Sequence, residues 1–243
     1  MSEQEETLRM DLTGTIEAIA KQQGIAYFGV AGLSVARDFI LEQGGPRVAE
    51  FPISISLGIT LPKAIVDQLP ARSERAVALN YRHHAYDVIN QRLDSMASLI
   101  SLLIQDKGYK ALPIPASVTV DDERLYGSFS HKLGAHLAGL GWIGKSCLLI
   151  TPKHGPRARW ATVLTDAPLS RADVNPPAEQ CGNCRECVDI CPVRAFTGRP
   201  FSREEPREAR YDVKKCNAYF KTMGDRGKQR VCGMCLYVCP YGR

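Results

Sequence analysis

The fold of the C-terminal part of this 243-residue chain is decided by residues 181–192, which read CGNCRECVDICP. In an iron–sulfur protein the spacing CxxCxxCxxxCP brings three thiolates to one cubic cluster and sends the fourth, before the proline, to a second cluster. A reciprocal set comes later, because Cys216 is succeeded by residues 232–240, which read CGMCLYVCP. Two 4Fe-4S clusters need eight cysteine ligands, and these segments contain eight.

The interlaced order of the cysteines predicts which of them share a cluster. Each cysteine before a proline crosses to the cluster that the other segment mainly holds. The first cluster is expected to be bound by Cys181, Cys184, Cys187 and Cys239, and the second by Cys216, Cys232, Cys235 and Cys191. Zinc sites also use CxxC pairs, but two tetrahedral zinc sites would not require the triple run and the two CP endings. Spacing specifies ligation and not reduction potential, so purely structural clusters stay an alternative to an electron relay.

The remaining composition favours a globular protein of the cytoplasm, with no membrane association. No apolar run approaches the roughly 20 residues of a membrane span, and the N-terminus, MSEQEETLRM, is polar and acidic, unlike a secretory signal. Nine cysteines in a reducing compartment favour metal ligands over disulfides. The ninth, Cys147, lies in apolar sequence and is expected in the core. The formal charge is +5, and basic residues are dense after residue 203. This density favours an acidic electron donor such as a flavodoxin or ferredoxin, RNA, or simply a solvated basic face.

Hydrophobic periodicity predicts an α+β domain ahead of the cysteines. Helices are expected over residues 6–23, 61–69, 86–107 and 131–140, and strands over residues 26–33, 51–61, 76–81, 111–115, 146–151 and 158–166. The clearest element is residues 86–107, in which one apolar stripe recurs every three or four residues and Gly108 supplies the stop. Residues 167–180 carry three prolines and resemble a linker. We therefore predict an α+β domain over residues 1–170 and a cluster module over residues 171–243.

Residues 139–146 read GLGWIGKS and satisfy two phosphate-binding patterns at once, GxGxxG and GxxxxGK[ST]. Both patterns require a strand before the loop and a helix after it, because the helix N-terminus holds the phosphate. Here a helical pattern precedes the glycines and a strand-like run comes after Ser146, which is the reverse order. A nucleotide-hydrolysing enzyme is therefore disfavoured. Three glycines in six residues instead allow the backbone to approach either a neighbouring element or a ligand closely.

Taken together, the motifs resemble a known family. AGLGWIGKS, LITPKHG, TDAPL, the CxxCxxCxxxCP run and the late CxxCxxxCP stand in an order that is similar to that of the epoxyqueuosine reductases, relatives of the reductive dehalogenases. The resemblance implies a nitroreductase-like N-terminal domain that holds a cobalamin above a ferredoxin-like module with two 4Fe-4S clusters. The residues that would then contact the corrinoid are Gly139, Gly141, Gly144 and Lys145.

The chain departs from that family at the catalytic acid and beyond the last cysteine. The segment at residues 111–117, ALPIPAS, contains no clear equivalent of the family's catalytic aspartate. Alternative proton donors in the next loop are Asp121, Asp122, Tyr126 and His131, of which we favour Asp122 and Tyr126. The helical-repeat extension of the family has no counterpart after the last cysteine. We therefore expect an unknown small-molecule substrate, and tRNA as an unlikely partner.

These patterns support two functions. The leading hypothesis is an oxidoreductase related to epoxyqueuosine reductase, which passes single electrons through its clusters to a corrinoid or to a substrate bound by the N-terminal domain. The alternative is a non-catalytic, ferredoxin-like electron carrier that docks on a partner enzyme and binds no corrinoid. Binding of cobalamin distinguishes the two.

Overall fold

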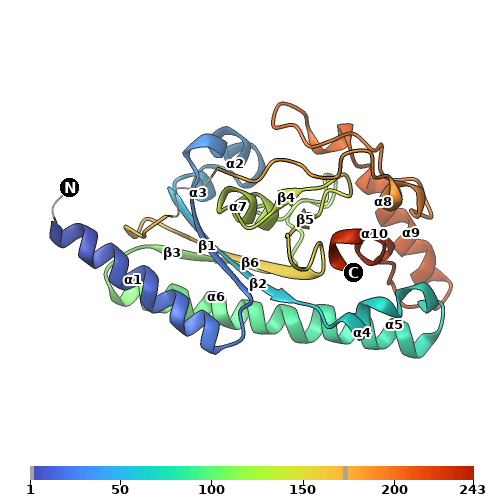
Figure 1. Cartoon of the computed structure of the whole chain (residues 1–243), viewed down its shortest axis with the longest axis horizontal. Coiled ribbons are helices and arrows are strands. Elements are labelled where there is room, and N and C mark those ends of the chain that lie inside the picture. Colours follow the sequence, from blue (N-terminus) through green and yellow to red (C-terminus); the bar gives the residue numbers. More distant parts are fainter. Residues whose placement is uncertain (1–2, 172–174) are drawn as a thin grey trace. The chain divides into compact units, whose positions relative to one another are not determined.

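The computed structural model describes residues 3–171 and 175–243, with side chains from residue 12 onward (Figure 1). The fold is mixed α/β, and its contacts group the chain into two compact units, each made of three segments. Unit 1 comprises Met1–Ile59, Asn90–Leu140 and Arg159–Pro176, and unit 2 comprises Thr60–Ile89, Gly141–Ala158 and Pro177–Arg243. The linear division of the chain at residue 170 stays a prediction about domains.

Unit 1 is built on a four-stranded sheet in the order β1, β2, β6, β3. The strands are β1 (Tyr27–Gly32), β2 (Ile53–Thr60), β3 (Ala111–Ile114) and β6 (Ala158–Thr165). β1 pairs antiparallel with β2, and β3 pairs antiparallel with β6. All residues of β2 except its last are buried, because this strand lies inside the sheet and is covered on both faces. The four predicted strands at these positions are confirmed.

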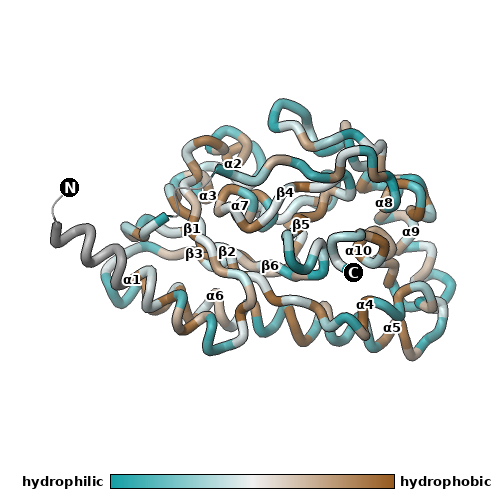
Figure 2. The backbone as a smooth tube through the Cα atoms, in the orientation of Figure 1, coloured by the Kyte–Doolittle hydropathy of each residue, from teal (hydrophilic) through white to brown (hydrophobic). Residues whose placement is uncertain are grey.

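The helices of unit 1 turn apolar stripes toward its core. They are α1 (Glu3–Gln22), α2 (Arg37–Gly44), α3 (Pro46–Ala49), α6 (Ile89–Asp106) and α7 (His131–Leu137), with a 3₁₀ turn η1 (Ser34–Ala36). Leu93, Ile100 and Ile104 of α6 are completely buried at helical spacing. Hydrophobic and polar residues alternate along this helix (Figure 2). Gly108 has a φ of +86° and ends the helical run. Within the described residues, no helix combines the length and the apolar character needed to cross a bilayer.

The prediction of a strand at residues 76–81 is wrong. This segment lies in α5 (Arg75–Arg82), which continues through a π-helical turn, η3 (His83–Val88), into α6. Ala78 and Tyr81 are its buried residues, and their spacing of three is that of one face of a helix. The run of small and apolar residues therefore forms a short amphipathic helix, in which Val77 is half-buried and the other side chains face solvent.

Unit 2 consists of short helices and one two-stranded hairpin, joined by loops. Besides α5 and η3 its elements are α4 (Lys63–Asp67), η2 (Leu69–Ala71), β4 (Trp142–Ile143), β5 (Leu149–Ile150), α8 (Glu186–Asp189), η4 (Arg207–Ala209), α9 (Val213–Asp225), α10 (Met234–Tyr237) and η5 (Pro240–Gly242). Helices shorter than about 12 residues are marginal in water on their own. The order of this unit therefore depends on tertiary contacts and on whatever its cysteines bind.

The stretch at residues 139–146 enters a β-hairpin rather than a helix. β4 pairs antiparallel with β5, so the strand predicted at residues 146–151 is limited to Leu149–Ile150. No helix lies between Ser146 and Ala158 in the described chain, so no helix N-terminus is available to a phosphate there.

Substitution of Gly141 by alanine is expected to disrupt this hairpin. A Cβ at residue 141 would lie 2.3 Å from the carbonyl oxygen of Ile150 and 2.9 Å from its carbonyl carbon, and backbone cannot yield as a side chain can. We expect Gly141→Ala to lower the free energy of unfolding by roughly 1–3 kcal/mol, measured from the denaturant midpoint of anaerobically purified protein.

The matched control for that experiment is Gly14→Ala. Gly14 is exposed in α1, and a Cβ there would meet open space. Alanine should stabilise the helix by up to about 1 kcal/mol. If Gly141→Ala were as stable as the wild type, the close packing of the two hairpin strands would be contradicted.

Candidate functional site

The eight predicted ligand cysteines lie in two groups within unit 2. Cysteine group 1 consists of Cys181, Cys184, Cys187 and Cys239, and all four side chains line one cavity. Burial raises the pKa of Cys187 to about 12, and the neighbouring thiols of the other three cysteines contribute to the rise. Burial likewise raises the pKa of Cys239 to about 11. Without a metal, the thiols of Cys187 and Cys239 stay protonated at neutral pH.

Cysteine group 2 consists of Cys191, Cys216, Cys232 and Cys235. Burial raises the pKa of Cys216, and the thiols of Cys232 and Cys191 add to this effect. Burial raises the pKa of Cys235 well above its usual range, with Cys232 and Cys216 as further causes. The thiol of Cys187, which belongs to group 1, also raises the pKa of Cys235. The two groups therefore adjoin each other, which suits single-electron transfer between them.

The thiols of group 1 line a cavity rather than converge on one point. Among the residues that the structure describes, no three His, Cys, Asp or Glu side chains are placed to bind a single metal ion together. A zinc ion holds each of its thiolates at about 2.3 Å, whereas an iron–sulfur cube stands between its thiolates and spreads them apart. The lining of this cavity by four thiols fits a group larger than one ion. The assignment of individual ligands to the two clusters stays a prediction.

Tight turns and backbone N–H groups position the cysteines. Gly182, with a φ of +48°, lets the Cys184 N–H donate to the Cys181 carbonyl oxygen at 2.8 Å. Beyond α8, the Cys191 sulfur accepts a hydrogen bond from the Ala195 N–H at 3.3 Å. A donor aimed at a cysteine sulfur stabilises the thiolate, which is the form that binds metal.

The β4–β5 hairpin presents its turn to Cys181. The buried Lys145 ammonium donates to the carbonyl oxygens of Gly182, at 2.5 Å, and Cys184, at 3.2 Å. Burial raises the pKa of the Cys181 thiol, while the Lys145 backbone N–H and the Trp142 indole act in the opposite direction. The indole N–H is buried and is directed at the Cys181 sulfur, but it forms no hydrogen bond of ordinary geometry within the described residues. A sulfide or thiolate of a bound cluster fits as its acceptor.

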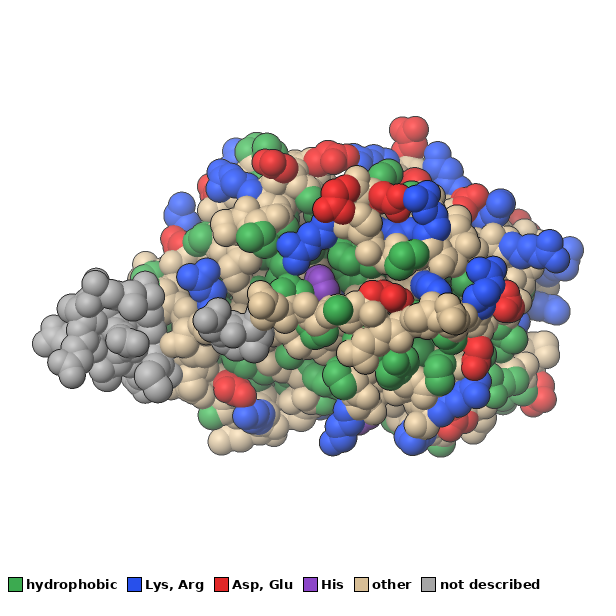
Figure 3. Space-filling model, turned by 45° about the horizontal axis from the view of Figure 1, so that its top comes forward, with side chains coloured by type: hydrophobic (Ala, Val, Ile, Leu, Met, Phe, Trp, Pro, Cys, Tyr) green, Lys and Arg blue, Asp and Glu red, His purple; other side chains and the backbone are tan. Residues whose placement is uncertain are grey.

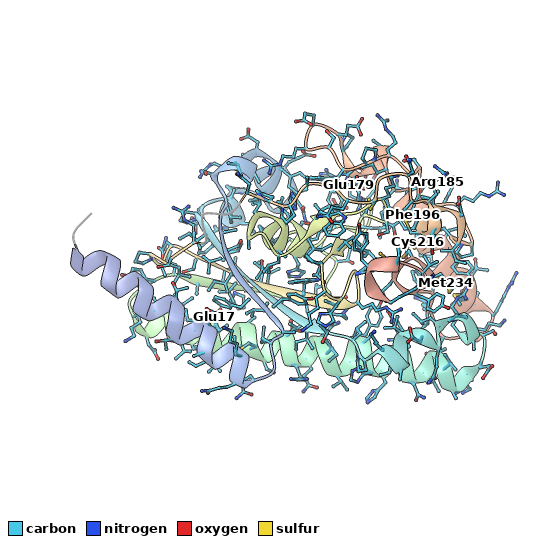
Figure 4. All side chains as sticks on the ribbon, viewed as in Figure 1. Glu17, Glu179, Arg185, Phe196, Cys216 and Met234 are labelled. Carbon is cyan, nitrogen blue, oxygen red and sulfur yellow. The ribbon has the colours of Figure 1, made fainter. Side chains whose placement is uncertain are left out.

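In group 2, Tyr211 directs a hydrogen-bond donor at a cysteine sulfur, as Trp142 does in group 1. This role was not predicted from the sequence. Burial raises the pKa of Tyr211 above its usual range, and the Cys216 thiol, which accepts a hydrogen bond from the hydroxyl, adds to the rise. The Tyr211 ring stacks on Phe196 with centroids 5.0 Å apart, and Phe196 and Cys216 are labelled in the same region of Figure 4. The thiol of Cys147 also raises the pKa of Tyr211. Cys147 is only 4% exposed, so its predicted place in the core is confirmed. No spacing rule connects a tyrosine to a cysteine group, so only the fold shows this contact.

A separate cavity lies in unit 1, in the loop between β3 and α7. Its volume is about 220 Å³, and residues 114–120, 127–129 and 131 line it. The lining residues include Ser117, Thr119, Ser128 and His131. A cavity with several polar groups favours a polar ligand over an apolar one.

His131 is fixed in this cavity as a neutral ring. Nδ1 lies 2.8 Å from the Thr162 hydroxyl, and Nε2 lies 3.0 Å from the Pro115 carbonyl oxygen. A carbonyl only accepts, so the proton is on Nε2, and Nδ1 accepts from Thr162. Burial, reinforced by the charge of Arg159, lowers the pKa of His131 to about 4. Both ring nitrogens are thus engaged, and His131 is a positioning residue rather than a proton donor.

The two favoured proton donors lie outside the lining of that cavity. Asp122 is exposed in the turn of the loop, where Asp121 accepts hydrogen bonds from the N–H groups of Glu123 and Arg124. Tyr126 is half-buried beneath the Arg124 guanidinium, which lies 4.7 Å from its ring centroid. The structure therefore places both residues in one turn and not against the cavity, and their catalytic role stays a prediction.

The residues predicted to contact a corrinoid are engaged elsewhere. Gly139 has a φ of +77° after α7. Gly141 and Gly144 pack on Ile150, and a Cβ on Gly144 would also lie 3.3 Å from the Cys181 sulfur. These glycines therefore serve a close approach of backbone to a strand and to a cysteine. Corrinoid contact by these residues stays a prediction.

Comparison with known proteins shows which proteins this chain is similar to. Residues 180–242 match the family model of a 4Fe-4S double cluster binding domain. The epoxyqueuosine reductase of Pseudomonas aeruginosa is 30% identical over 231 residues, which cover 89% of this chain and 57% of that protein. The predicted resemblance to epoxyqueuosine reductases is confirmed. The chain spans little more than half the length of this relative.

Solved structures share the same fold. An epoxyqueuosine reductase solved with an epoxyqueuosine-modified tRNA-Tyr stem loop has a TM-score of 0.60 at 17% identity, covering 96% of this chain and 65% of that one. A reductive dehalogenase, described with a mechanism for B12-dependent dehalogenation, has a TM-score of 0.66 at 21% identity, covering 94% of this chain and 31% of that one. At these identities the similarity shows the fold alone.

The prediction of tRNA as an unlikely partner, with an unknown small molecule as substrate, is wrong. The relatives are epoxyqueuosine reductases, and one of similar fold is solved with a modified tRNA stem loop. The prediction rested on the helical extension that the family carries after its clusters. That reasoning was unsound because binding to phosphate depends on basic surface, which any part of a chain can supply.

The neutral His131 predicts how stability depends on pH. Its pKa in the folded protein, about 4, lies below the ordinary value of 6.5, so the unfolded chain binds a proton that the folded chain does not. Stability should therefore fall as the pH is lowered from 6.5 to 4, by roughly 1–3 kcal/mol. His131→Gln should flatten this part of the pH profile of the denaturant midpoint. His83→Gln is the control, because His83 is exposed, with 74% of its side chain accessible. Parallel profiles for wild type and His131→Gln would contradict the assignment.

Proposed function

We propose that the chain is a two-cluster iron–sulfur oxidoreductase of the epoxyqueuosine reductase type, which passes single electrons through two 4Fe-4S clusters to a modified nucleoside in tRNA. The observation that carries the proposal is the grouping of eight cysteines into two adjoining sets of four. The resemblance to epoxyqueuosine reductases supports the reaction class. The proposal includes a nitroreductase-like build for residues 1–170, a ferredoxin-like module over residues 171–243 and a cytoplasmic location.

In this proposal, each cysteine group holds one cluster. Group 1 binds the first cluster and group 2 the second, as the spacing predicts, and Cys187 and Cys235 are the residues through which the groups adjoin. The donors that the chain supplies fit such a group, because the buried indole N–H of Trp142 and the hydroxyl of Tyr211 are directed at cysteine sulfurs. A bound 4Fe-4S cluster supplies reversible one-electron transfer. The protein holds the thiolates, orients hydrogen bonds to sulfur and keeps the site half-buried.

Cobalamin is a second cofactor of this proposal. Support comes from the reductive dehalogenase of similar fold, which is described with a B12-dependent mechanism. Gly141, Gly144 and Lys145 do not form an open cradle, because Ile150, Cys181 and two carbonyl oxygens already occupy the space around them. A corrinoid bound by this chain would therefore need other residues to hold it. A shift of the visible spectrum on adding stoichiometric cobalamin would place one in the protein.

The substrate side of the proposal is the cavity between β3 and α7. Its hydroxyl-bearing lining suits a nucleoside, whose base and sugar are polar, and His131 keeps the cavity wall in place through Thr162 and Pro115. Asp122 and Tyr126, in the turn of the same loop, are the proposed proton donors.

Recognition of tRNA would draw on the basic residues of unit 2. The formal charge is +5, and the exposed basic residues from position 203 onward include Arg203, Lys214, Lys215, Lys221, Arg226, Lys228 and Arg230. Figure 3 shows Lys and Arg side chains interspersed with Asp and Glu on the visible face. Binding through phosphate contacts weakens steeply with salt.

Cys191→Ser tests the interlaced ligands. Because Cys191 precedes a proline in the first cysteine segment yet lies in group 2, its loss should remove the second cluster and leave most iron at group 1. Iron and sulfide analysis of anaerobic protein should fall from about eight to about four atoms of each per chain. Cys147→Ser is the matched control, because this buried cysteine belongs to neither group, and its iron content should stay complete. Equal loss of iron from both clusters would contradict the assignment.

The reaction is tested with tRNA that carries epoxyqueuosine. Anaerobic protein with complete iron, a chemical reductant and cobalamin should change the mass of the modified nucleoside released from the tRNA. Raising salt from about 50 to 200 mM should lower tRNA affinity by at least tenfold, because a few phosphate contacts are enough to produce a fall of this size. Cys191→Ser should abolish turnover and retain tRNA binding. If protein with complete iron and cobalamin left the nucleoside unchanged, the proposed substrate would be excluded, and if it bound no tRNA, the proposed partner would be excluded as well.

A further inference from the structure

Lys145 is a buried cation among the cysteines of group 1. Its exposed fraction is 8%, and its side chain lines the cavity that Cys181, Cys184, Cys187 and Cys239 also line. Burying an ammonium group costs several kcal/mol unless nearby groups compensate its charge. The protein therefore has to balance this charge locally.

Hydrogen bonds alone do not balance it. The ammonium has three N–H groups, and its acceptors among the described residues are the carbonyl oxygens of Gly182 and Cys184. Lys145 forms no ion pair with a carboxylate in the described part of the chain. Carbonyl groups supply only partial charge, so an anion bound in the cavity would complete the balance.

The other charged groups around this cavity are acidic or tied to acids. The Glu179 carboxylate accepts the Cys181 N–H at 2.9 Å. Glu186 lines the cavity and pairs with Arg243 at 3.1 Å, and half of the Arg243 side chain is exposed. Lys145 is therefore the buried positive charge that faces group 1 within the described residues.

We propose that Lys145 sets the reduction potential of the cluster in group 1, by holding an ammonium charge beside it. A 4Fe-4S cluster bound by four thiolates is an anion, and one-electron reduction adds a further negative charge. A fixed cation stabilises the reduced state more than the oxidised state, which raises the potential. The inference rests on the proposed ligand assignment and adds a function for the GLGWIGKS stretch, whose glycines bring Lys145 to Cys181.

The test is a redox titration of anaerobic protein with dithionite as the one-electron donor, followed by electron paramagnetic resonance. The signal of group 1 is the one that survives in Cys191→Ser. Lys145→Gln should shift the reduction equilibrium of that cluster about tenfold toward the oxidised state, which is a fall of ~59 mV for one electron. The second cluster should keep its potential.

Two variants separate the charge from its surroundings. Lys145→Arg keeps a cation and should keep a potential close to that of the wild type. Lys153→Gln removes an equal charge from an exposed position in the turn after β5, where solvent screens it, and should leave both potentials unchanged. If Lys145→Gln fails to assemble the first cluster, Lys145→Arg decides: an assembled cluster at the wild-type potential supports the proposal, and one at a lowered potential overturns it.

The remaining outcomes are distinct. An unchanged potential in Lys145→Gln with complete iron would overturn the role of Lys145 and leave the two-cluster assignment intact. Wild-type protein that binds no iron would instead overturn the proposed function.

Discussion

Eight cysteine side chains have to be held in two adjoining groups. Group 1 is anchored by two hydrogen bonds, which the Lys145 ammonium donates to the carbonyl oxygens of Gly182 and Cys184. These carbonyls belong to the turn that carries the first two cysteines. A hairpin from the middle of the chain thereby fixes the start of the cysteine segment. Unit 2 is assembled from three distant segments because the cysteine segment alone contains too little regular structure to order itself.

Burial gives this arrangement its chemical character. The thiols of Cys187, Cys235 and Cys239 have raised pKa values chiefly because they are removed from water. Such thiols release protons when a metal binds, so metal binding and the order of the site are coupled. Donors such as the Ala195 N–H then favour the thiolate. Half-burial also lowers the local dielectric, which makes a single fixed charge effective there.

Local patterns predicted most regular elements and failed where context decides. The stripe at residues 86–107 predicts a helix because its period is unambiguous. AVALNY is too short to show a period, and it forms a helix because α5 continues into the long helix after it. The loop between β3 and α7 suggested proton donors by residue type alone, yet the fold fixes His131 as a neutral ring and leaves Asp122 in solvent. Residue type indicates what a side chain can do, but not what it touches.

The sequence by itself determined that eight cysteines stand in two segments with the spacing of a double-cluster motif, because spacing within a cysteine motif is a local property of the chain. It also indicated that GLGWIGKS requires close backbone approach. Only the tertiary structure decided what is approached: Ile150 and Cys181, with Lys145 on the cysteine turn and Trp142 beside the sulfur. The hydrogen bonds from Lys145 to the cysteine turn join residues 37 and 39 positions apart, and no period or spacing rule reaches across that distance.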